Sequence, residues 1–121
     1  MGRSARELVF HRLADAITAG QFDGLEKFFT EDFVLHDPNA PETPTGHEGV
    51  RHMLRSFSKL GDALALQPVQ MIEAEDHVTV RWALSWSHNG APQQAAILAI
   101  YRFEGALIAE DWGISARAPW P

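Results

Sequence analysis

The chain has 121 residues, of which 45% are hydrophobic; it contains no cysteine and carries a formal net charge of −6. This length predicts a single domain over residues 1–121, which can bury roughly two thirds of its unfolded surface. The lack of cysteine excludes disulfides, thiolate chemistry and thiolate metal sites. The acidic balance argues against a nucleic-acid partner, because phosphate contacts need clustered Lys and Arg.

Targeting segments are not expected either. No run of about 18 apolar residues is present, so the sequence predicts no membrane span and no membrane partner. Residues 1–8 lack the apolar core of a signal peptide, and a cytoplasmic protein is therefore the expectation.

The first quarter of the chain shows helical periodicity. Apolar residues between positions 9 and 17 form one stripe, which predicts a first helix that ends at Gly20. A second cluster of apolar residues over positions 22–29 predicts a short second helix.

A strand, a loop and a third helix are expected next. The strand covers Phe33–Asp37, and residues 38–44 form a loop because three prolines in seven residues remove backbone donors. Residues 45–48, Thr-Gly-His-Glu, match a capping box that starts a helix. Apolar residues at i, i+3, i+4 and i+7 from Val50 continue this helix toward Gly61.

Everything after Gly61 alternates in polarity and is broken by short turns, which predicts four strands. Short sequential connections predict an antiparallel meander curled over three helices. Helices followed by strands give an α+β fold, and the tapered space between the layers is expected to hold a small ligand. The expected strands are Leu64–Ala74, Val78–Ser87, Gln93–Phe103 and Leu107–Ser115.

Strand alternation groups the candidate pocket residues by face. In the second of these strands Val78, Val80, Trp82, Leu84 and Trp86 share one face. In the last strand Glu110 lies with Ile108, Trp112 and Ile114, and Asp111 lies on the other face. Periodicity leaves open which face is inward. Because a carboxylate rarely stays buried and unpaired, the inward one is either tied to Arg81 or functional.

The element order and several short motifs resemble the nuclear transport factor 2-like superfamily. Within it the chain is similar to the SnoaL-like polyketide cyclases and, more remotely, to ketosteroid isomerase. The resemblance spans nearly the whole chain. It implies a cone-shaped fold, in which a curved, mainly antiparallel sheet wraps around three N-terminal helices, and a homodimer formed through the outer sheet face. The motifs are Ala19-Gly-Gln-Phe-Asp23, Thr30-Glu-Asp-Phe33, His36-Asp-Pro38, Gly46-His-Glu-Gly-Val-Arg51, Tyr101-Arg-Phe103 and Ile108-Ala-Glu-Asp-Trp112.

The resemblance also implies catalytic positions. Asp37 lies where ketosteroid isomerase carries its proton-shuttling Asp, and His36 and His88 resemble histidines of the cyclases. Other positions depart from these families. The two oxyanion donors of the isomerase fall on or near Leu13 and Ala99, and the acid/base Asp of the cyclases falls on Ala116.

Each catalytic candidate has a plainer alternative. Asp37 is a general acid/base or an Asp that caps the Pro38 turn through nearby backbone amides. His36 is a pocket residue or, if Asp37 points inward, an outward one, because adjacent strand residues face opposite ways. His88 is a pocket residue or an exposed residue beside a hairpin turn.

The expected substrate-binding residues are Trp82, Trp86, Trp112, Arg81, Phe33, Met53 and Phe57. The aromatic residues are core residues that could also stack on a flat ligand. Arg81 binds an acidic group or pairs with a neighbouring carboxylate. No metal site is expected, since His47 and His52 are five residues apart and miss the i, i+4 spacing of helical ligands.

These observations favour an enzyme that binds a hydrophobic, cyclic or polyketide-like molecule and needs no cofactor. Proton transfer by Asp37 would drive an isomerisation or an aldol-type ring closure, with His88 and a Trp indole stabilising the oxyanion. The alternatives are a binding protein with the same pocket and no chemistry, and a dimeric interaction module that uses the outer sheet face.

Overall fold

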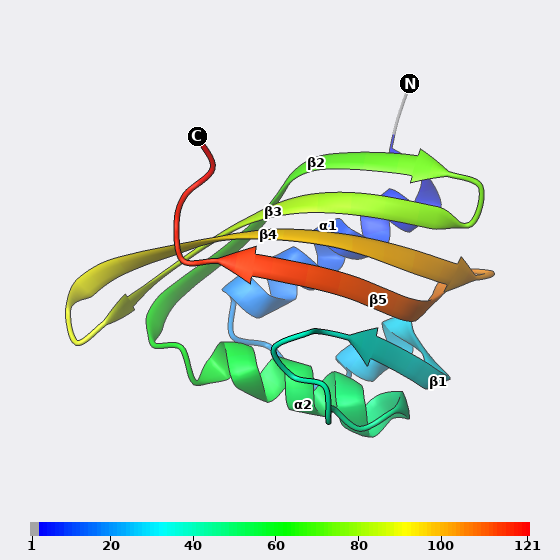
Figure 1. Cartoon of the computed structure of the whole chain (residues 1–121), viewed down its shortest axis with the longest axis horizontal. Coiled ribbons are helices and arrows are strands. Elements are labelled where there is room, and N and C mark those ends of the chain that lie inside the picture. The colour runs from blue at the N-terminus through cyan, green and yellow to red at the C-terminus, as the bar shows by residue number, and fades with distance from the viewer. Residues whose placement is uncertain (1–2) are drawn as a thin grey trace.

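The computed structural model describes residues 3–121 and confirms the expected α+β fold (Figure 1). Within these residues, two α-helices and one short 3₁₀ helix (η1) accompany five strands. The elements are α1 (Ala5–Thr18), η1 (Leu25–Phe28), β1 (Phe29–His36), α2 (Gly46–Ser58), β2 (Asp62–Ala74), β3 (His77–His88), β4 (Ala91–Glu104) and β5 (Leu107–Ala116).

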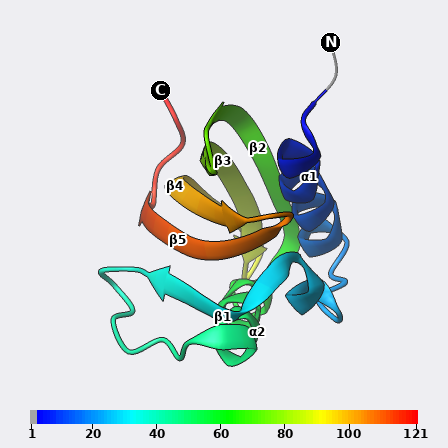
Figure 2. The same cartoon turned by 90° about the vertical axis from the view of Figure 1, so that its right-hand side faces the viewer.

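The five strands form one sheet in the order β1-β5-β4-β3-β2. Strands β2 to β5 pair antiparallel, as their short turns predict, and β1 joins the edge of β5 in parallel. The sheet is therefore mixed. It curls toward the helices but does not close into a barrel (Figure 2).

Both α-helices lie on the same side of the curled sheet, α1 against β2 and α2 against β1 (Figure 2). The predicted apolar stripe of α1 is its buried face, from Val9 to Ile17. Gly20 follows the end of this helix with a positive φ of 72°, a conformation that favours glycine. Neither α-helix in this part of the chain is long and apolar enough to cross a membrane.

The expectation of three helices is wrong, because residues 22–29 form only the single turn η1 and the first residue of β1. Gly24 adopts a left-handed conformation (φ 82°) immediately before η1, which interrupts any longer helix. Strand β1 consequently starts at Phe29, four residues earlier than predicted. It ends at His36, so Asp37 lies one residue beyond the strand.

One face of the sheet packs against the helices and forms the core. On β3 the inward residues are Val78, Val80, Trp82, Leu84 and Trp86, the five that alternation placed on one face. The largest fully buried side chains come from both layers: Phe10, Phe33, Phe103, Ile108, Val50, Val78 and Val80.

Strand β5 departs from simple alternation through a bulge at Ala109. Residues 102–103 of β4 are consecutive, yet their partners on β5 are Glu110 and Ile108, so Ala109 is an extra residue. Ile108 and Asp111 therefore both belong to the buried face, although alternation assigned them to opposite faces. The bulge decides which carboxylate of the Glu110–Asp111 pair enters the interior.

The free edge of β2 is covered by the last residue of α1. The hydroxyl of Thr18 accepts a hydrogen bond from the Leu66 N–H at 3.0 Å and donates to the Leu66 carbonyl at 3.3 Å. An edge strand otherwise presents such groups unpaired, so this contact ties α1 to the sheet.

We expect Thr18→Val to lower the free energy of unfolding by about 1–3 kcal/mol, because valine keeps the shape but leaves both backbone groups of Leu66 without their partner. Urea denaturation measures the difference. Thr79→Val, on the opposite face of the sheet, is the matched control and should change stability by less than about 0.5 kcal/mol. Equal losses in the two variants would contradict a specific role for the Thr18 contact.

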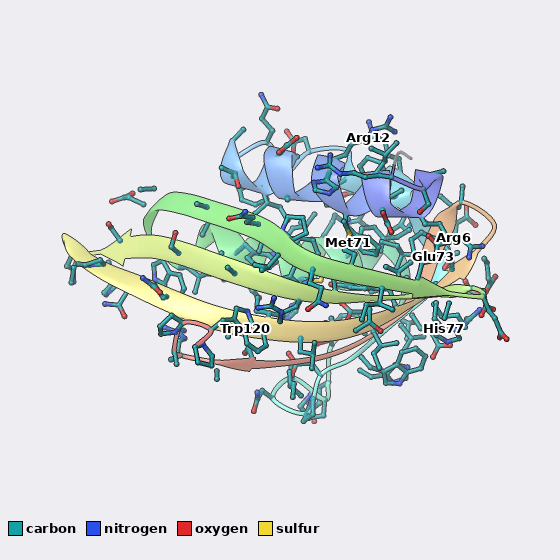
Figure 3. The ribbon with its side chains drawn as sticks, turned by 90° about the horizontal axis from the view of Figure 1, so that it is seen from above. Arg6, Arg12, Met71, Glu73, His77 and Trp120 are labelled. Carbon is teal, nitrogen blue, oxygen red and sulfur yellow. The ribbon has the colours of Figure 1, made fainter. Side chains whose placement is uncertain are left out.

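The end of the chain around Trp120 lies on the face of the sheet opposite to the helices. Figure 3 shows Trp120 on that side, whereas Met71 points from β2 toward α1. The Trp120 indole donates to the carbonyl of Trp82 at 2.8 Å. The Arg81 guanidinium carbon lies 5.1 Å from the centre of the Trp120 ring. These contacts attach the end segment to β3.

Candidate active site

A cavity of about 290 Å³ lies between the inner face of the sheet and the two helices. Leu13 and Ile17 of α1, Ala40 and Thr43 of the β1–α2 loop, and side chains of α2 and the sheet line it. Most of the lining is apolar. The volume is at the lower end of the range for small-molecule sites, roughly 300–1,000 Å³, so the cavity suits a small hydrophobic ligand.

Asp37 reaches this cavity from the residue that follows β1. It is half-buried, and its Oδ1 accepts a hydrogen bond from the backbone N–H of Asn39 at 2.9 Å. Asp37 therefore caps the turn and also lines the cavity. Among residues 3–121, its second oxygen accepts no hydrogen bond and is available to a ligand.

Asp111 lines the same cavity from the inner face of β5. Its side chain is among the few buried polar groups, with 5% of the residue exposed. Its Oδ1 has no hydrogen-bond partner in the described part of the chain. A buried oxygen without a partner costs about 1–3 kcal/mol, so this group is held in place at the expense of stability.

The environment of Asp111 favours its neutral form. Burial, and then the nearby charge of Asp37, raise the pKa of Asp111 from 3.8 to about 7. Near neutral pH the Asp111 carboxyl thus exchanges its proton readily, while the Asp37 charge opposes its ionisation. Two carboxyl groups in such unlike surroundings can divide the roles of base and acid.

Tyr101 is the cross-strand partner of Asp111 and lines the cavity beside it. The indole N–H of Trp82 donates to the Tyr101 hydroxyl oxygen at 2.9 Å. Burial, and then the charge of Asp111, raise the pKa of Tyr101 well above its ordinary value, so the phenol keeps its proton. The Phe10 ring packs 4.6 Å from the Tyr101 ring and fixes its position.

A known family model matches most of this sequence. The model of the SnoaL-like domain covers residues 10–111. The chain belongs to the SnoaL-like family.

Solved structures agree with this SnoaL-like fold. A proposed polyketide cyclase from Acidithiobacillus ferrooxidans is 17% identical, with a TM-score of 0.83 over 97% of this chain and 92% of that one. IdmH, a proposed polyketide cyclase from Streptomyces antibioticus, is 20% identical, with a TM-score of 0.75 over 91% of both chains.

A protein of ketosteroid isomerase-like fold from Catenulispora acidiphila, crystallised with trimethylamine, is also similar. It is 20% identical, with a TM-score of 0.75 over 88% of this chain and 83% of that one. At these identities the likeness establishes the fold alone.

Five of the predicted site residues lie together in the cavity of this SnoaL-like domain. Asp37 and the two aromatic residues Trp82 and Trp86 line its sheet side, and Met53 and Phe57 line it from α2. The sequence therefore predicted four residues of the apolar wall and one of the two acids. Their roles toward a ligand remain predictions.

His36 and Trp112 lie outside the cavity, on the outer face of the sheet. The His36 Nε2 is 2.8 Å from Oε2 of Glu110, and the imidazole stacks on Trp112 with ring centres 5.0 Å apart. Since Asp37 points inward, its neighbour His36 points outward, which is the arrangement that strand alternation required. Neither residue contacts the cavity, contrary to their predicted roles.

Arg81, His88 and Phe33 are also absent from the cavity wall. Arg81 lies on the outer face, where it donates to the side chain of Gln70 at 3.2 Å. His88 is exposed at the end of β3, with its Nε2 3.4 Å from the Asn89 side chain. Phe33 is fully buried in the core, 4.9 Å from the Phe29 ring. The structure places none of the three where the site was expected.

Sequence reasoning missed Asp111 and Tyr101. It did predict that one of Glu110 and Asp111 is inward and either tied to Arg81 or functional, and the inward one is Asp111. Glu110 accepts from Arg102 at 2.7 Å and contacts His36, and these two bonds lower the pKa of Glu110. The inward Asp111 is not tied to Arg81. In residues 3–121 no group of three or more His, Asp or Glu side chains is placed to hold a metal ion.

Proposed function

We propose that this SnoaL-like domain is a cofactor-independent acid/base enzyme, an isomerase or an aldol-type cyclase, acting on a hydrophobic cyclic or polyketide-like substrate. The observation that carries this proposal is the pair of carboxyl groups, Asp37 and Asp111, in one apolar cavity. The names of the similar structures, which include proposed polyketide cyclases, support the substrate class.

In this proposal Asp37 is the base. It removes a proton from a carbon next to a carbonyl, and negative charge develops on the carbonyl oxygen as the enolate forms. Asp37 takes this role because it lines the cavity, is only half-buried and has one oxygen that accepts no hydrogen bond within residues 3–121. Asp111, which burial and the Asp37 charge keep protonated below about pH 7, faces the same space and can donate to the developing charge.

A non-catalytic binding protein is the second candidate. Leu13 and Ala99 both line the cavity, at positions where the resemblance to ketosteroid isomerase places hydrogen-bond donors. These apolar residues favour retention of a hydrophobic ligand over chemistry. A binding protein would hold the ligand without altering it.

Hydrogen–deuterium exchange separates the two candidates. The planar cyclic ketone 1-indanone is incubated with the protein in D₂O, and loss of the proton signal next to its carbonyl is followed by NMR. We expect exchange well above that caused by buffer with an equal concentration of acetate. Saturable binding of 1-indanone with exchange at the acetate rate would rule out the enzyme and favour the binding protein.

The outer sheet face is the proposed contact with a second copy of the chain. Five large apolar side chains of β2, β4 and β5 are exposed there. Ile100 is paired in register with Trp112, and Leu98 with Ile114, and a patch of this kind marks an interface. The patch consists of Ile72, Leu98, Ile100, Trp112 and Ile114.

We therefore expect Ile100→Lys to convert a dimer into a monomer, because a lysine buried at the two-fold contact would lose its hydration. Sedimentation velocity measures the change in mass. Leu107→Lys replaces another exposed apolar residue, at the start of β5 and outside the patch, and should leave the dimer intact. A wild type that is monomeric at micromolar concentrations would overturn this expectation.

A further inference from the structure

We propose that Tyr101 and Asp111 together form a two-donor site for one acceptor oxygen of the ligand, a ketone carbonyl or its enolate, with Trp82 as a positioning residue. This inference deepens the proposed function and rests on it for the identity of the reacting oxygen. As a statement about binding it can be tested separately.

Tyr101 and Asp111 are directly paired across β4 and β5, on the inner face of the sheet. Side chains of such a pair have Cβ atoms about 5 Å apart, and the charge of Asp111 acts on the phenol strongly enough to raise the pKa of Tyr101. Yet the two make no hydrogen bond to each other, and Asp111 Oδ1 has no partner among residues 3–121. Since Oδ1 is enclosed by the protein, a ligand oxygen would contact the Asp111 carboxyl through Oδ2 and accept from the Tyr101 hydroxyl.

The hydrogen bond from Trp82 sets the direction of the Tyr101 proton. A phenol oxygen donates one hydrogen bond and accepts others. The Trp82 indole N–H can only donate, so at 2.9 Å it must occupy an acceptor position of the Tyr101 oxygen. The Tyr101 O–H then points elsewhere, and it donates no hydrogen bond to any residue of 3–121. Its donor capacity is left for an occupant of the cavity.

The two side chains select a ligand that carries an acceptor oxygen. Tyr101 and the neutral carboxyl of Asp111 both present an O–H to the same place, and a carbonyl oxygen has two lone pairs to accept them. Donors aimed at an oxygen that gains charge, in an apolar space, stabilise an enolate more strongly than they would in water. A protonated amine is the other ligand that an acid pair can hold, but it offers nothing to the Tyr101 O–H.

Other charged groups around Asp111 are few. Asp37 after β1, Tyr101 on β4, His52 on α2 and Arg117 after β5 are the titratable residues of the cavity lining. Arg117 stacks over Trp86, with its guanidinium carbon 4.8 Å from the ring centre. Since Asp111 donates only while protonated, affinity for an acceptor oxygen should fall as the pH rises through about 7.

Two ligands that differ by one oxygen test the site. 1-Indanone carries the acceptor and indane lacks it, and calorimetry gives both dissociation constants at pH 6 for wild type and Tyr101→Phe. We expect Tyr101→Phe to weaken 1-indanone about tenfold and to leave indane unchanged. The infrared carbonyl band of bound 1-indanone should move to higher frequency in this variant. Asp32→Asn, an exposed acid on β1, is the control and should match wild type for both ligands.

Trp82→Phe tests the positioning role. Without the indole N–H, the Tyr101 proton is no longer directed into the cavity, so the carbonyl band should broaden and shift part of the way toward that of Tyr101→Phe. A purely structural role for Trp82 would weaken indane and 1-indanone equally and leave the band in place.

Several results would overturn the site. They are unchanged 1-indanone affinity in Tyr101→Phe, equal weakening of both ligands, or tighter binding of protonated 1-aminoindane than of 1-indanone. If Tyr101→Phe fails to fold, the wild type decides: 1-indanone affinity must fall between pH 6 and pH 8 while indane affinity stays constant.

The two proposals can fail separately. Proton exchange without this oxygen-dependent binding would refute the two-donor site and leave the proposed enzyme standing. The binding pattern without exchange would refute the enzyme and keep the site.

Discussion

Asp111→Asn is expected to make the protein more stable than wild type above pH 7, by up to about 4 kcal/mol. The pKa of the buried carboxyl rises from 3.8 to about 7, and each pKa unit corresponds to about 1.36 kcal/mol. Wild type must therefore ionise a buried, unpartnered group at high pH, whereas asparagine has no charge to desolvate.

The sign of this effect follows from proton binding. The folded state holds the Asp111 proton more tightly than the unfolded state does, so this contribution is fully present below pH 3.8 and is lost as the pH rises through about 7. Glu110 acts in the opposite sense. Arg102 and His36 lower its pKa, so its contribution is present above pH 4.5 and is lost as the pH falls through the lowered value. Wild type should be most stable at mildly acidic pH.

Urea unfolding at pH 5 and pH 8 measures the Asp111 effect. We expect wild type to lose about 2–3 kcal/mol between these two pH values and Asp111→Asn to lose much less. Asp32→Asn is the control and should follow wild type, since its side chain is exposed. Parallel pH profiles for wild type and Asp111→Asn would mean that the Asp111 carboxyl is not neutralised by burial.

The order of elements could be predicted because it depends on local signals. Prolines in residues 38–44, glycines at the ends of the helices and strict alternation along β3 act within a few residues of chain. The helix expected at residues 22–29 failed for a local reason as well, since the left-handed Gly24 was not recognised as a break. Periodicity alone does not distinguish a continuous helix from a turn followed by a strand.

The site was less predictable because its geometry depends on pairing between distant residues. The bulge at Ala109 sets the register of β5 against β4, and only that register places Asp111 beside Tyr101 on the inner face. Alternation did predict that His36 and Asp37 point opposite ways. The pairing of β1 with β5, residues more than 70 positions away, decides that Asp37 is the inward one. No sequence window contains that information.

The exposed aromatic and basic residues illustrate the same limit. Trp112 and Arg81 belong to the outer face, where they contact His36 and Trp120, and residue type alone favoured a place in the pocket. Tyr101 was noticed only as part of a motif. Its hydrogen bond with Trp82 joins the neighbouring strands β3 and β4 on the inner face, so its place in the site appears only once the sheet is assembled.

Asp37→Asn is expected to slow proton exchange of 1-indanone by about 10²–10⁴-fold, or roughly 3–5 kcal/mol in activation free energy. Asparagine keeps the size of the side chain and an oxygen that can accept from the Asn39 N–H, so the turn after β1 should survive. It cannot take up a proton at neutral pH, and the base is lost. Affinity for 1-indanone should change little, because Asp37 does not hold the ligand oxygen in this arrangement.

The variant also reports on which acid is the base. Asp37 is the second cause of the raised pKa of Asp111, so removing its charge should lower the pH at which 1-indanone affinity declines. Asp32→Asn should leave both exchange and affinity unchanged. If Asp37→Asn retained full exchange while Asp111→Asn lost it, the two roles would be reversed, with the buried carboxyl as the base. Exchange retained in both variants would show that neither carboxyl moves the proton, and both role assignments would then be wrong.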